Sequence, residues 1–209
     1  FAYRVQDTPG GIAQALGLAE DFAQGESICA ILGDNVYFDN LTPAIQSFEK
    51  GGHIFLKDVP DPERFGIAEI SSLPPTTYHL QPHVLSIEEK PQHPRSNLAI
   101  TGCYLYDNRC FEIIRNLKPS ARGEMEITDV GRWYLDHREL TASILEKEWI
   151  DAGTFESLFQ ATKLVRSEKV HTTENASEDP TRTLCKMDHT EAGHECKQSS
   201  HREPATPAA

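Results

Sequence analysis

Four segments of this chain carry carboxylates where strand-like or turn-like patterns end, and together they could bind a metal ion and a phosphorylated ligand. The segments are Cys29-Ala-Ile-Leu-Gly-Asp34-Asn35, Ile87-Glu-Glu-Lys-Pro91, Ser120-Ala-Arg-Gly-Glu-Met-Glu-Ile-Thr-Asp129 and Trp149-Ile-Asp-Ala-Gly-Thr154. An apolar run that stops at Gly-Asp indicates a buried parallel strand whose last side chain emerges at the carboxyl edge of a sheet, where α/β folds bind ligands. If Asp34 and Asp151 both end such strands, they could hold Mg²⁺, which takes few protein carboxylates and completes its coordination with water and substrate phosphates. The expected ligand therefore carries phosphates.

Alternating strand and helix patterns must position these carboxylates. Strand-like runs cover residues 1–6, 27–33, 53–59 and 65–70, and helical spacing covers 11–24 and 40–50. This order predicts a parallel α/β sheet with right-handed crossovers. Further along, residues 84–90 and 98–107 suit antiparallel strands laid over a cleft, residues 140–146 suit a strand, and helices are expected after Asp107, near Glu126 and after Thr154.

The apolar residues are distributed unevenly along the 209 residues. From residue 168 onward there is no Phe, Tyr or Trp, and Ser, Thr, Glu, His and Pro dominate. Such a segment cannot offset its ordering entropy by burial, so we expect a folded domain over 1–167 and a disordered tail over 168–209. The tail contains four possible zinc ligands, but their spacing matches no usual zinc pattern and no apolar residues accompany them; the ligands are Cys185, His189, His194 and Cys196.

The net charge of −12 argues against binding to nucleic acid or to an anionic membrane. No apolar stretch reaches the length of about 18 residues that a membrane span needs. Five Cys in a chain of this size, three of them in apolar or amphipathic runs, indicate buried thiols and not a disulfide framework. These features predict a cytoplasmic protein.

Beyond these local patterns, seven segments occur together in an order that resembles the sugar-1-phosphate nucleotidyltransferases, most closely their glucose-1-phosphate thymidylyltransferase branch. They are Gln6-Asp-Thr-Pro-Gly-Gly-Ile-Ala-Gln-Ala15, Leu32-Gly-Asp-Asn-Val36, Arg64-Phe-Gly-Ile-Ala-Glu69, Glu88-Glu-Lys-Pro-Gln-His-Pro-Arg-Ser-Asn97, Ile100-Thr-Gly-Cys-Tyr-Leu-Tyr-Asp107, Ser120-Ala-Arg-Gly-Glu-Met-Glu-Ile-Thr-Asp129 and Asp151-Ala-Gly-Thr-Phe-Glu156. The resemblance covers residues 1 to about 166. It implies a Rossmann-like, GT-A-like mixed α/β sheet flanked by helices.

The activity implied by the resemblance is attack by the phosphate of glucose 1-phosphate on the α-phosphorus of dTTP, which releases pyrophosphate and forms dTDP-glucose. Positioning and cations supply most of the catalysis in such a phosphoryl-type transfer. The resemblance places Asp34 and Asp151 on Mg²⁺, and Gln6 and Gly11 against the thymine base. It places five residues around the sugar phosphate, with Lys90 and Arg122 as its cations: Gly66, Glu89, Lys90, Thr101 and Arg122. It also implies that the parent protein is a homo-oligomer.

The family opens with a strand, a Gly-rich signature loop with an Arg, and a Lys further on, and none of these is in this sequence. We therefore expect a partial domain that lacks the first strand–helix units, with impaired turnover. Residues 1–6 should lie displaced or irregularly paired, and the strand over 27–33 should be an exposed edge or have a substitute neighbour. The alternatives are a non-catalytic remnant that binds sugar phosphate or nucleotide, and a uridylyltransferase of the same fold.

Four of the site residues also have purely structural interpretations. Asp34 could cap a turn, as Asp commonly does after Gly. Glu89 with Lys90 could be an exposed charge pair of little energetic weight. Arg122 could belong to a helix N-terminus, where the acids that follow it are favourable.

Overall fold

The structure is a computed structural model that describes residues 1–71 and 82–175, with the side chains of the last helix described as far as Ser167. The chain divides at Ser167, and the fold below is that of Phe1–Ser167. None of the helices in these ranges is long and apolar enough to cross a membrane.

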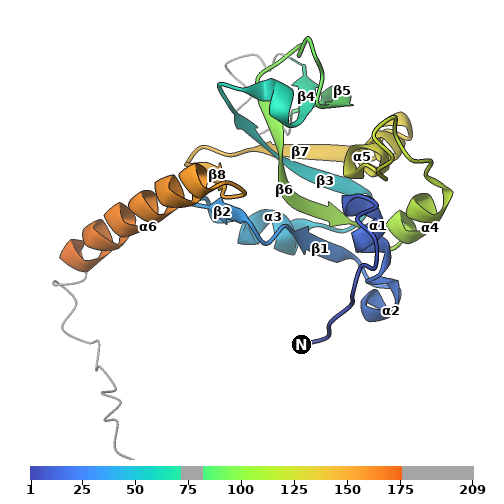
Figure 1. Cartoon of the computed structure of the whole chain (residues 1–209), viewed down its shortest axis with the longest axis horizontal. Helices are drawn as coiled ribbons and strands as arrows, with labels where there is room; N and C mark the ends of the chain where they lie inside the picture. Colours follow the sequence, from blue (N-terminus) through green and yellow to red (C-terminus); the bar gives the residue numbers. More distant parts are fainter. Residues whose placement is uncertain (72–81, 176–209) are drawn as a thin grey trace, which may run out of the picture. The chain divides into compact units, whose positions relative to one another are not determined.

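Helices are interspersed with strands in the first part of the chain and again toward its end (Figure 1). The strands are β1 (Ile28–Ile31), β2 (Asn35–Tyr37), β3 (Gly52–Asp58), β4 (Gly66–Ile70), β5 (Val84–Glu89), β6 (Leu98–Tyr106), β7 (Leu140–Ile144) and β8 (Trp149–Asp151). The helices are α1 (Ile12–Gly17), α2 (Glu20–Ala23), α3 (Thr42–Ser47), the 3-10 turn η1 (Pro62–Arg64), α4 (Arg109–Asn116), α5 (Ile127–Asp136) and α6 (Phe155–Asn175).

The main sheet is mixed, and β6 is its central strand. Its order is β5-β4-β6-β3-β7, with β1 also paired to β6, and a separate two-stranded ribbon joins β2 to β8. Strands β1, β3 and β4 all run antiparallel to β6, and the parallel pair of this sheet is β3 with β7. The predicted parallel sheet is therefore wrong for β1 and β3, because β6, which comes later in the chain, lies between them. The mixed sheet implied by the resemblance is confirmed.

The two faces of the sheet carry separate apolar clusters, as the period-two alternation of strands requires. On β3, Ile54 and Leu56 face one cluster and Phe55 faces the other. The first cluster is covered by α1, α4 and α5, which lie together at one end of the sheet in Figure 1. The second includes Trp149 from the β2–β8 ribbon, with Phe48 next to α3 packed against it.

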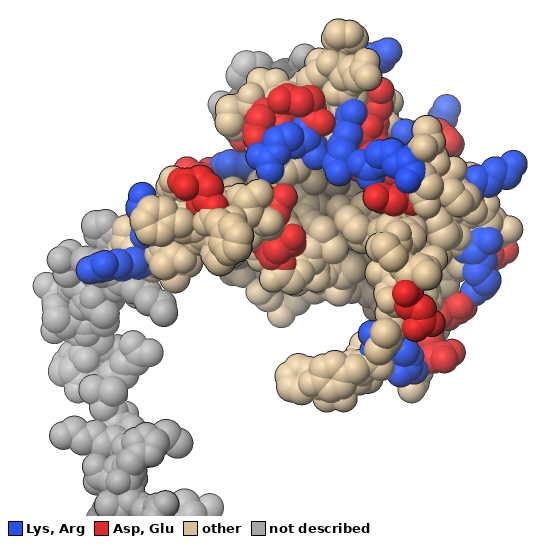
Figure 2. Space-filling view, viewed as in Figure 1, with Lys and Arg blue, Asp and Glu red and all other residues tan. Residues whose placement is uncertain are grey.

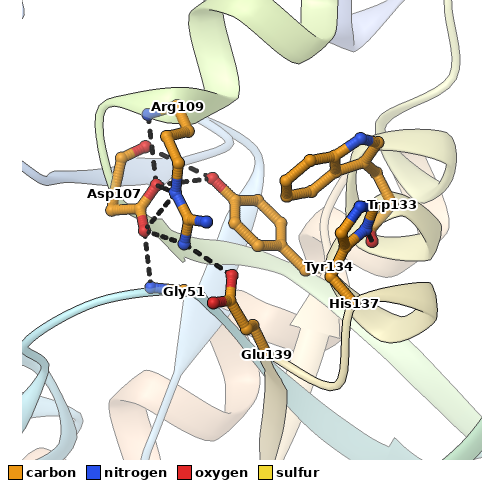
Figure 3. A network of polar contacts seen from close by, with 7 residues as sticks. All are labelled: Gly51, Asp107, Arg109, Trp133, Tyr134, His137 and Glu139. Carbon is orange, nitrogen blue, oxygen red and sulfur yellow. Dashed lines mark hydrogen bonds and ion pairs between the residues drawn. The ribbon is translucent and has the colours of Figure 1, made fainter.

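A polar network fixes the end of β6 to α5 and to the turn before β3 (Figure 3). The Asp107 carboxylate accepts hydrogen bonds from the Gly51 N–H at 2.7 Å and the Tyr134 hydroxyl at 2.8 Å. Arg109 lies 2.6 Å from both Asp107 and Glu139. Burial opposes ionisation of Asp107, but the hydrogen bonds from Arg109, Gly51 and Tyr134 outweigh it and lower the pKa of this carboxyl.

The first residues depart from regular structure. Residues 1–6 form no strand and are exposed, as expected for a displaced segment. Strand β1 pairs only with β6 among the described strands, so it is an edge. The single helix predicted over 11–24 is two short helices, α1 and α2, separated at Leu18 and Ala19.

At the other end, α6 continues to Asn175. Residues 168–175, which were expected to begin a disordered tail, are the last residues of this helix, and the disorder of the tail stays a prediction. Thr154 Oγ1 accepts the Ser157 N–H at 3.1 Å at the start of the helix. Residues 176–209, including the four possible zinc ligands, lie outside the described residues.

Candidate functional site

A cavity of about 180 Å³ opens between the β4–β5 pair, β6 and the first turn of α5. Its wall combines charged side chains with two glycines and several apolar residues. The lining residues are Ile12, Leu32, Arg64, Phe65, Gly66, Glu89, Lys90, Ile100, Gly102, Tyr104, Arg122, Glu124, Glu126, Ile127, Thr128 and Asp151. Five residues expected from the sequence, Gly66, Glu89, Lys90, Arg122 and Asp151, thus line one cavity.

Glu89 is held at this wall by its neighbours on two elements. It lies opposite Gly66 in the β4–β5 pairing, and its Oε2 accepts a hydrogen bond from Thr128 Oγ1 at 2.9 Å. Burial raises the pKa of Glu89, Glu126 raises it further, and the Thr128 hydrogen bond works the other way. A Cβ at position 66 would lie 2.7 Å from a methyl carbon of Thr128, so only glycine fits here. Thr128 therefore packs directly against β4 at the wall of the cavity.

Arg122 is enclosed by carboxylates. Its guanidinium lies 2.6 Å from Glu124, 3.2 Å from Glu126 and 3.9 Å from Glu89. Glu126 is buried and also accepts the Ser120 hydroxyl at 2.7 Å. The guanidinium is thus held in place before any ligand arrives, with part of its charge already balanced.

The cavity has a mixed charge. Three of its lining residues are cations, Arg64, Lys90 and Arg122, and four are carboxylates, Glu89, Glu124, Glu126 and Asp151. Figure 2 likewise shows Lys and Arg gathered with Asp and Glu in one band across the face drawn. Because the lining has no excess of positive charge, a ligand with several phosphates needs a further cation to bind.

Asp34 and Asp151 converge on the turn after β8. The β2–β8 ribbon aligns Asn35 with Asp151, and the Ala152 N–H donates to the Asp34 carbonyl at 2.7 Å. A Cβ built on Gly153 would lie 3.0 Å from Asp151 Oδ1 and 3.4 Å from Asp34 Oδ2. Two carboxylate oxygens therefore approach one point from strands far apart in sequence, a donor set that suits Mg²⁺. Within residues 1–71 and 82–167, no cluster of three or more metal-ligating side chains occurs.

Asn35 orients the Asp34 carboxylate. Its amide oxygen accepts hydrogen bonds from the Gly102 N–H at 3.0 Å and the Trp149 indole N–H at 2.7 Å. With the oxygen held by two donors, the amide nitrogen donates to Asp34 Oδ1 at 2.9 Å. A Cβ at position 102 would lie 2.7 Å from Asn35 Oδ1, so Gly102 makes this contact possible.

Gln6 and Gly11 lie together beside the cavity and are not among its lining residues. Gln6 donates to Gln14 at 2.6 Å and to the Gly11 carbonyl at 3.2 Å. Gly11 has a φ of 97°, and a Cβ there would lie 2.5 Å from the Met125 carbonyl oxygen. Backbone hydrogen bonds from both sides hold this loop to Met125, next to Glu126 of the cavity.

Thr101 was expected beside the sugar phosphate, and the structure does not bring it to the cavity. It is fully buried in β6 and is not among the lining residues. Thr128 lines the cavity instead and contacts Glu89, although it was not among the expected residues. One sequence signal could have identified Thr128: it lies in the first turn of the helix that follows Ser120-Ala-Arg-Gly-Glu-Met-Glu. Asn35 and Trp149 were also missed, because Asn35 contacts Gly102 and Trp149 only through the fold. Glu126 was missed although its partners Ser120 and Arg122 are close to it in sequence.

The chain was compared with known families and curated proteins. A family described as Nucleotidyl transferase matches residues 1–168. A glucose-1-phosphate thymidylyltransferase of Neisseria meningitidis is 40% identical over 173 residues, which are 80% of this chain and 57% of that protein. One of Mycobacterium tuberculosis is 39% identical over 172 residues, again 80% of this chain and 57% of that protein. The chain thus spans little more than half the length of these relatives.

Solved structures resemble the fold closely. A Bacillus anthracis structure named as a glucose-1-phosphate thymidylyltransferase and solved with sucrose has a TM-score of 0.70 and 47% identity, covering 79% of this chain and 65% of that one. A UDP-glucose pyrophosphorylase solved with UDP-glucose also has a TM-score of 0.70, at 22% identity, and covers 80% of this chain and 66% of that one. At that identity the second likeness supports the fold alone.

Proposed function

The chain belongs to the nucleotidyl transferase family, and from that premise we propose that it carries the site for nucleotidyl transfer from dTTP to glucose 1-phosphate. In this reaction a phosphate oxygen of glucose 1-phosphate attacks the α-phosphorus of dTTP. A new P–O bond forms while the bond to pyrophosphate breaks, and dTDP-glucose and pyrophosphate leave. Because little covalent chemistry falls to the protein, the site must chiefly hold two anionic substrates in line.

The glucose 1-phosphate position is proposed for the cavity between β4, β5 and α5. Glu89 would accept hydrogen bonds from glucose hydroxyls, since Thr128 occupies only one of its two oxygens. Gly66 would form part of the wall that the sugar meets, since it lines the cavity where the Thr128 methyl group leaves no room for a side chain. Lys90 would place its charge on the phosphate, and Arg122 would add a planar donor fork.

The proposed metal position is beside Gly153. Asp34 and Asp151 would hold Mg²⁺ there, with Asn35 keeping the Asp34 carboxylate in one orientation. When bound, the ion would supply positive charge for the phosphate oxygens. Gln6 and Gly11 are proposed for the thymine base, in a loop fixed to Met125 at the edge of the cavity.

One observation carries this proposal: Asp151 belongs both to the pair of carboxylates proposed for Mg²⁺ and to the lining of the proposed sugar-phosphate cavity. Asp151 lines the cavity and also faces Asp34 across Gly153. A phosphate in the cavity would therefore lie next to the two carboxylates, which is the arrangement that transfer between two phosphorylated substrates requires.

The test is made in two steps with the whole chain. Pyrophosphate release is measured with dTTP, glucose 1-phosphate and Mg²⁺, and the affinity for each substrate is measured by calorimetry. The Glu89→Gln variant should weaken binding of glucose 1-phosphate more than binding of dTTP. Equal weakening of both would contradict the assignment of Glu89 to the sugar. Binding of both substrates without pyrophosphate release would support a binding function and contradict catalysis by this chain.

A further inference from the structure

Two cysteine thiols lie side by side on one face of the main sheet. Cys29 is on the edge strand β1 and exposed, and Cys103 is on the central strand β6 and buried. Their sulfur atoms are 3.9 Å apart. The cavity described above includes neither residue, and nothing in the proposed function uses them.

The strand register explains why the two thiols meet. Cys29 pairs with Leu105, and Ile31 pairs with Cys103, so the cysteines are diagonal neighbours whose side chains point to the same face. Diagonal Cα atoms are about 7–8 Å apart, slightly more than a disulfide usually spans. A covalent bond of about 2.05 Å therefore needs a small shift of β1 along β6. Such a shift is feasible because β1 has four residues and, among the described strands, pairs with β6 alone.

The two thiols differ in chemistry. The hydrogen bond with Cys103 lowers the pKa of Cys29 to about 7, although partial burial opposes this. The same hydrogen bond, together with burial, raises the pKa of Cys103. Cys29 is thus the more accessible and more acidic thiol, and Cys103 is the buried thiol beside it. This pairing of an exposed thiolate with a second thiol is typical of oxidation-sensitive cysteines.

We propose that Cys29 and Cys103 form a peroxide-sensitive pair that closes into a reversible disulfide between β1 and β6. The Cys29 thiolate attacks one oxygen of hydrogen peroxide, an S–O bond forms, the O–O bond breaks, and water leaves once protonated. The Cys103 sulfur then attacks the Cys29 sulfenic acid, the S–S bond forms, and the S–O bond breaks. The Cys103 proton leaves with the hydroxide as a second water. Two thiols are oxidised by two electrons, and one peroxide is reduced to two waters.

The cross-link would form close to the turn after β1, which carries the proposed metal ligand Asp34. The N–H of Leu32, three residues after Cys29, donates at 2.8 Å to the carbonyl of Gly102, which directly precedes Cys103. Gly102 in turn donates to Asn35. The modification is a property of the thiols alone and does not depend on the proposed transfer activity.

The test uses the full chain with Cys185→Ser and Cys196→Ser, which leaves three of the five cysteines. The reduced protein is treated near neutral pH with an equimolar amount of hydrogen peroxide, alkylated under denaturing conditions and mapped by mass spectrometry without reduction. We expect the chain to lose two hydrogen atoms, to yield a cross-linked peptide containing Cys29 and Cys103, and to return to the starting mass with dithiothreitol. Cys110 is the internal control, since it is fully buried and burial raises its pKa to about 12.

Two variants separate the roles of the thiols. In Cys103→Ser, dimedone should trap a sulfenic acid at Cys29, and in Cys29→Ser, Cys103 should react no faster than Cys110. Alkylation of Cys29 in the untreated protein should be at least roughly tenfold faster than that of Cys110. The proposal is overturned if peroxide leaves Cys29 and Cys103 unlinked, if Cys29 is linked to Cys110, or if Cys29 is oxidised to a sulfinic acid while Cys103 stays reduced.

Discussion

Thr128 donates its hydroxyl hydrogen to Glu89 at 2.9 Å and thereby joins the first turn of α5 to the end of β5. The contact fixes one oxygen of a carboxylate that burial makes harder to ionise. Two elements that are distant in the sequence thus together fix the orientation of Glu89, which is proposed to bind the sugar. The contact also sets the space at Gly66, where the Thr128 methyl group excludes any side chain.

Replacing Thr128 with Val should weaken glucose 1-phosphate binding by about 1 kcal/mol, or roughly fivefold, because Glu89 loses a hydrogen bond. The pKa of Glu89 should rise as well, since that bond favours the ionised form. Calorimetry with glucose 1-phosphate measures the affinity, and the dTTP affinity is the reference. Thr141→Val is the control, because Thr141 contacts His53 and the Gly52 carbonyl away from the cavity. An unchanged affinity in Thr128→Val would contradict a role for this contact.

Replacing Asp34 or Asp151 with Asn should reduce Mn²⁺ binding, used as a probe for Mg²⁺, by roughly tenfold or more, because each change removes one charged oxygen ligand. Asp58→Asn is the matched control, since Asp58 is exposed at the end of β3. Electron paramagnetic resonance of free Mn²⁺ gives the bound fraction without any need for turnover. Full binding in both variants would rule out the proposed metal position.

Replacing Asp107 with Asn should lower the free energy of unfolding by about 2 kcal/mol at neutral pH. The Asn side chain lacks the negative charge that Arg109 faces. Its NH₂ group also replaces a carboxylate oxygen that accepts a hydrogen bond, so a donor of the chain would face a donor. Since the folded-state pKa of Asp107 is lowered, its contribution is present above the ordinary carboxyl range and is lost as the pH falls through the folded value. Urea unfolding measures the effect. Asp136→Asn, at an exposed position of α5, should change stability little, and an equal loss there would refute the explanation.

His53 should make the protein less stable as the pH falls. Burial lowers the pKa of His53 to about 4, and the unfolded chain has the ordinary value near 6.5. Between these pH values the unfolded state binds more protons than the folded state. The contribution of neutral His53 to the free energy of unfolding is therefore fully present above about pH 6.5 and declines toward the folded pKa, by about 2 kcal/mol down to pH 5.

The measurement for His53 compares the wild-type chain with His53→Gln, which cannot titrate. The wild-type advantage in the free energy of unfolding should shrink from pH 7 to pH 5. Thr141 lies at hydrogen-bond distance from the His53 ring, at 2.8 Å, so the side chain at position 53 has a polar neighbour in both proteins. A constant difference across this range would mean that His53 does not titrate in the unfolding reaction.

Several features of the fold followed from the sequence because they depend on local spacing. The helix expected near Glu126 and the strands expected over 53–59 and 98–107 lie within a few residues of the observed α5, β3 and β6. Asp151 ends β8, as the residues before it indicated, whereas Asp34 lies in the turn between β1 and β2 and not at the end of a strand. The family motifs occur in a fixed order, and Gly66, Glu89, Lys90, Arg122 and Asp151 do line one cavity.

The tertiary structure decided which of these elements became neighbours. Spacing along the chain specifies which residues of a strand share a face, but not which strand lies beside it, because that choice depends on the packing of both sheet faces. The sequence could not show that β6 would separate β1 from β3, and that arrangement places Cys103 against Cys29. It also buries Thr101 in the middle of the sheet. Thr128 reaches Glu89 for the same reason, since hydrogen bonds between distant segments form only once the sheet and α5 are packed together.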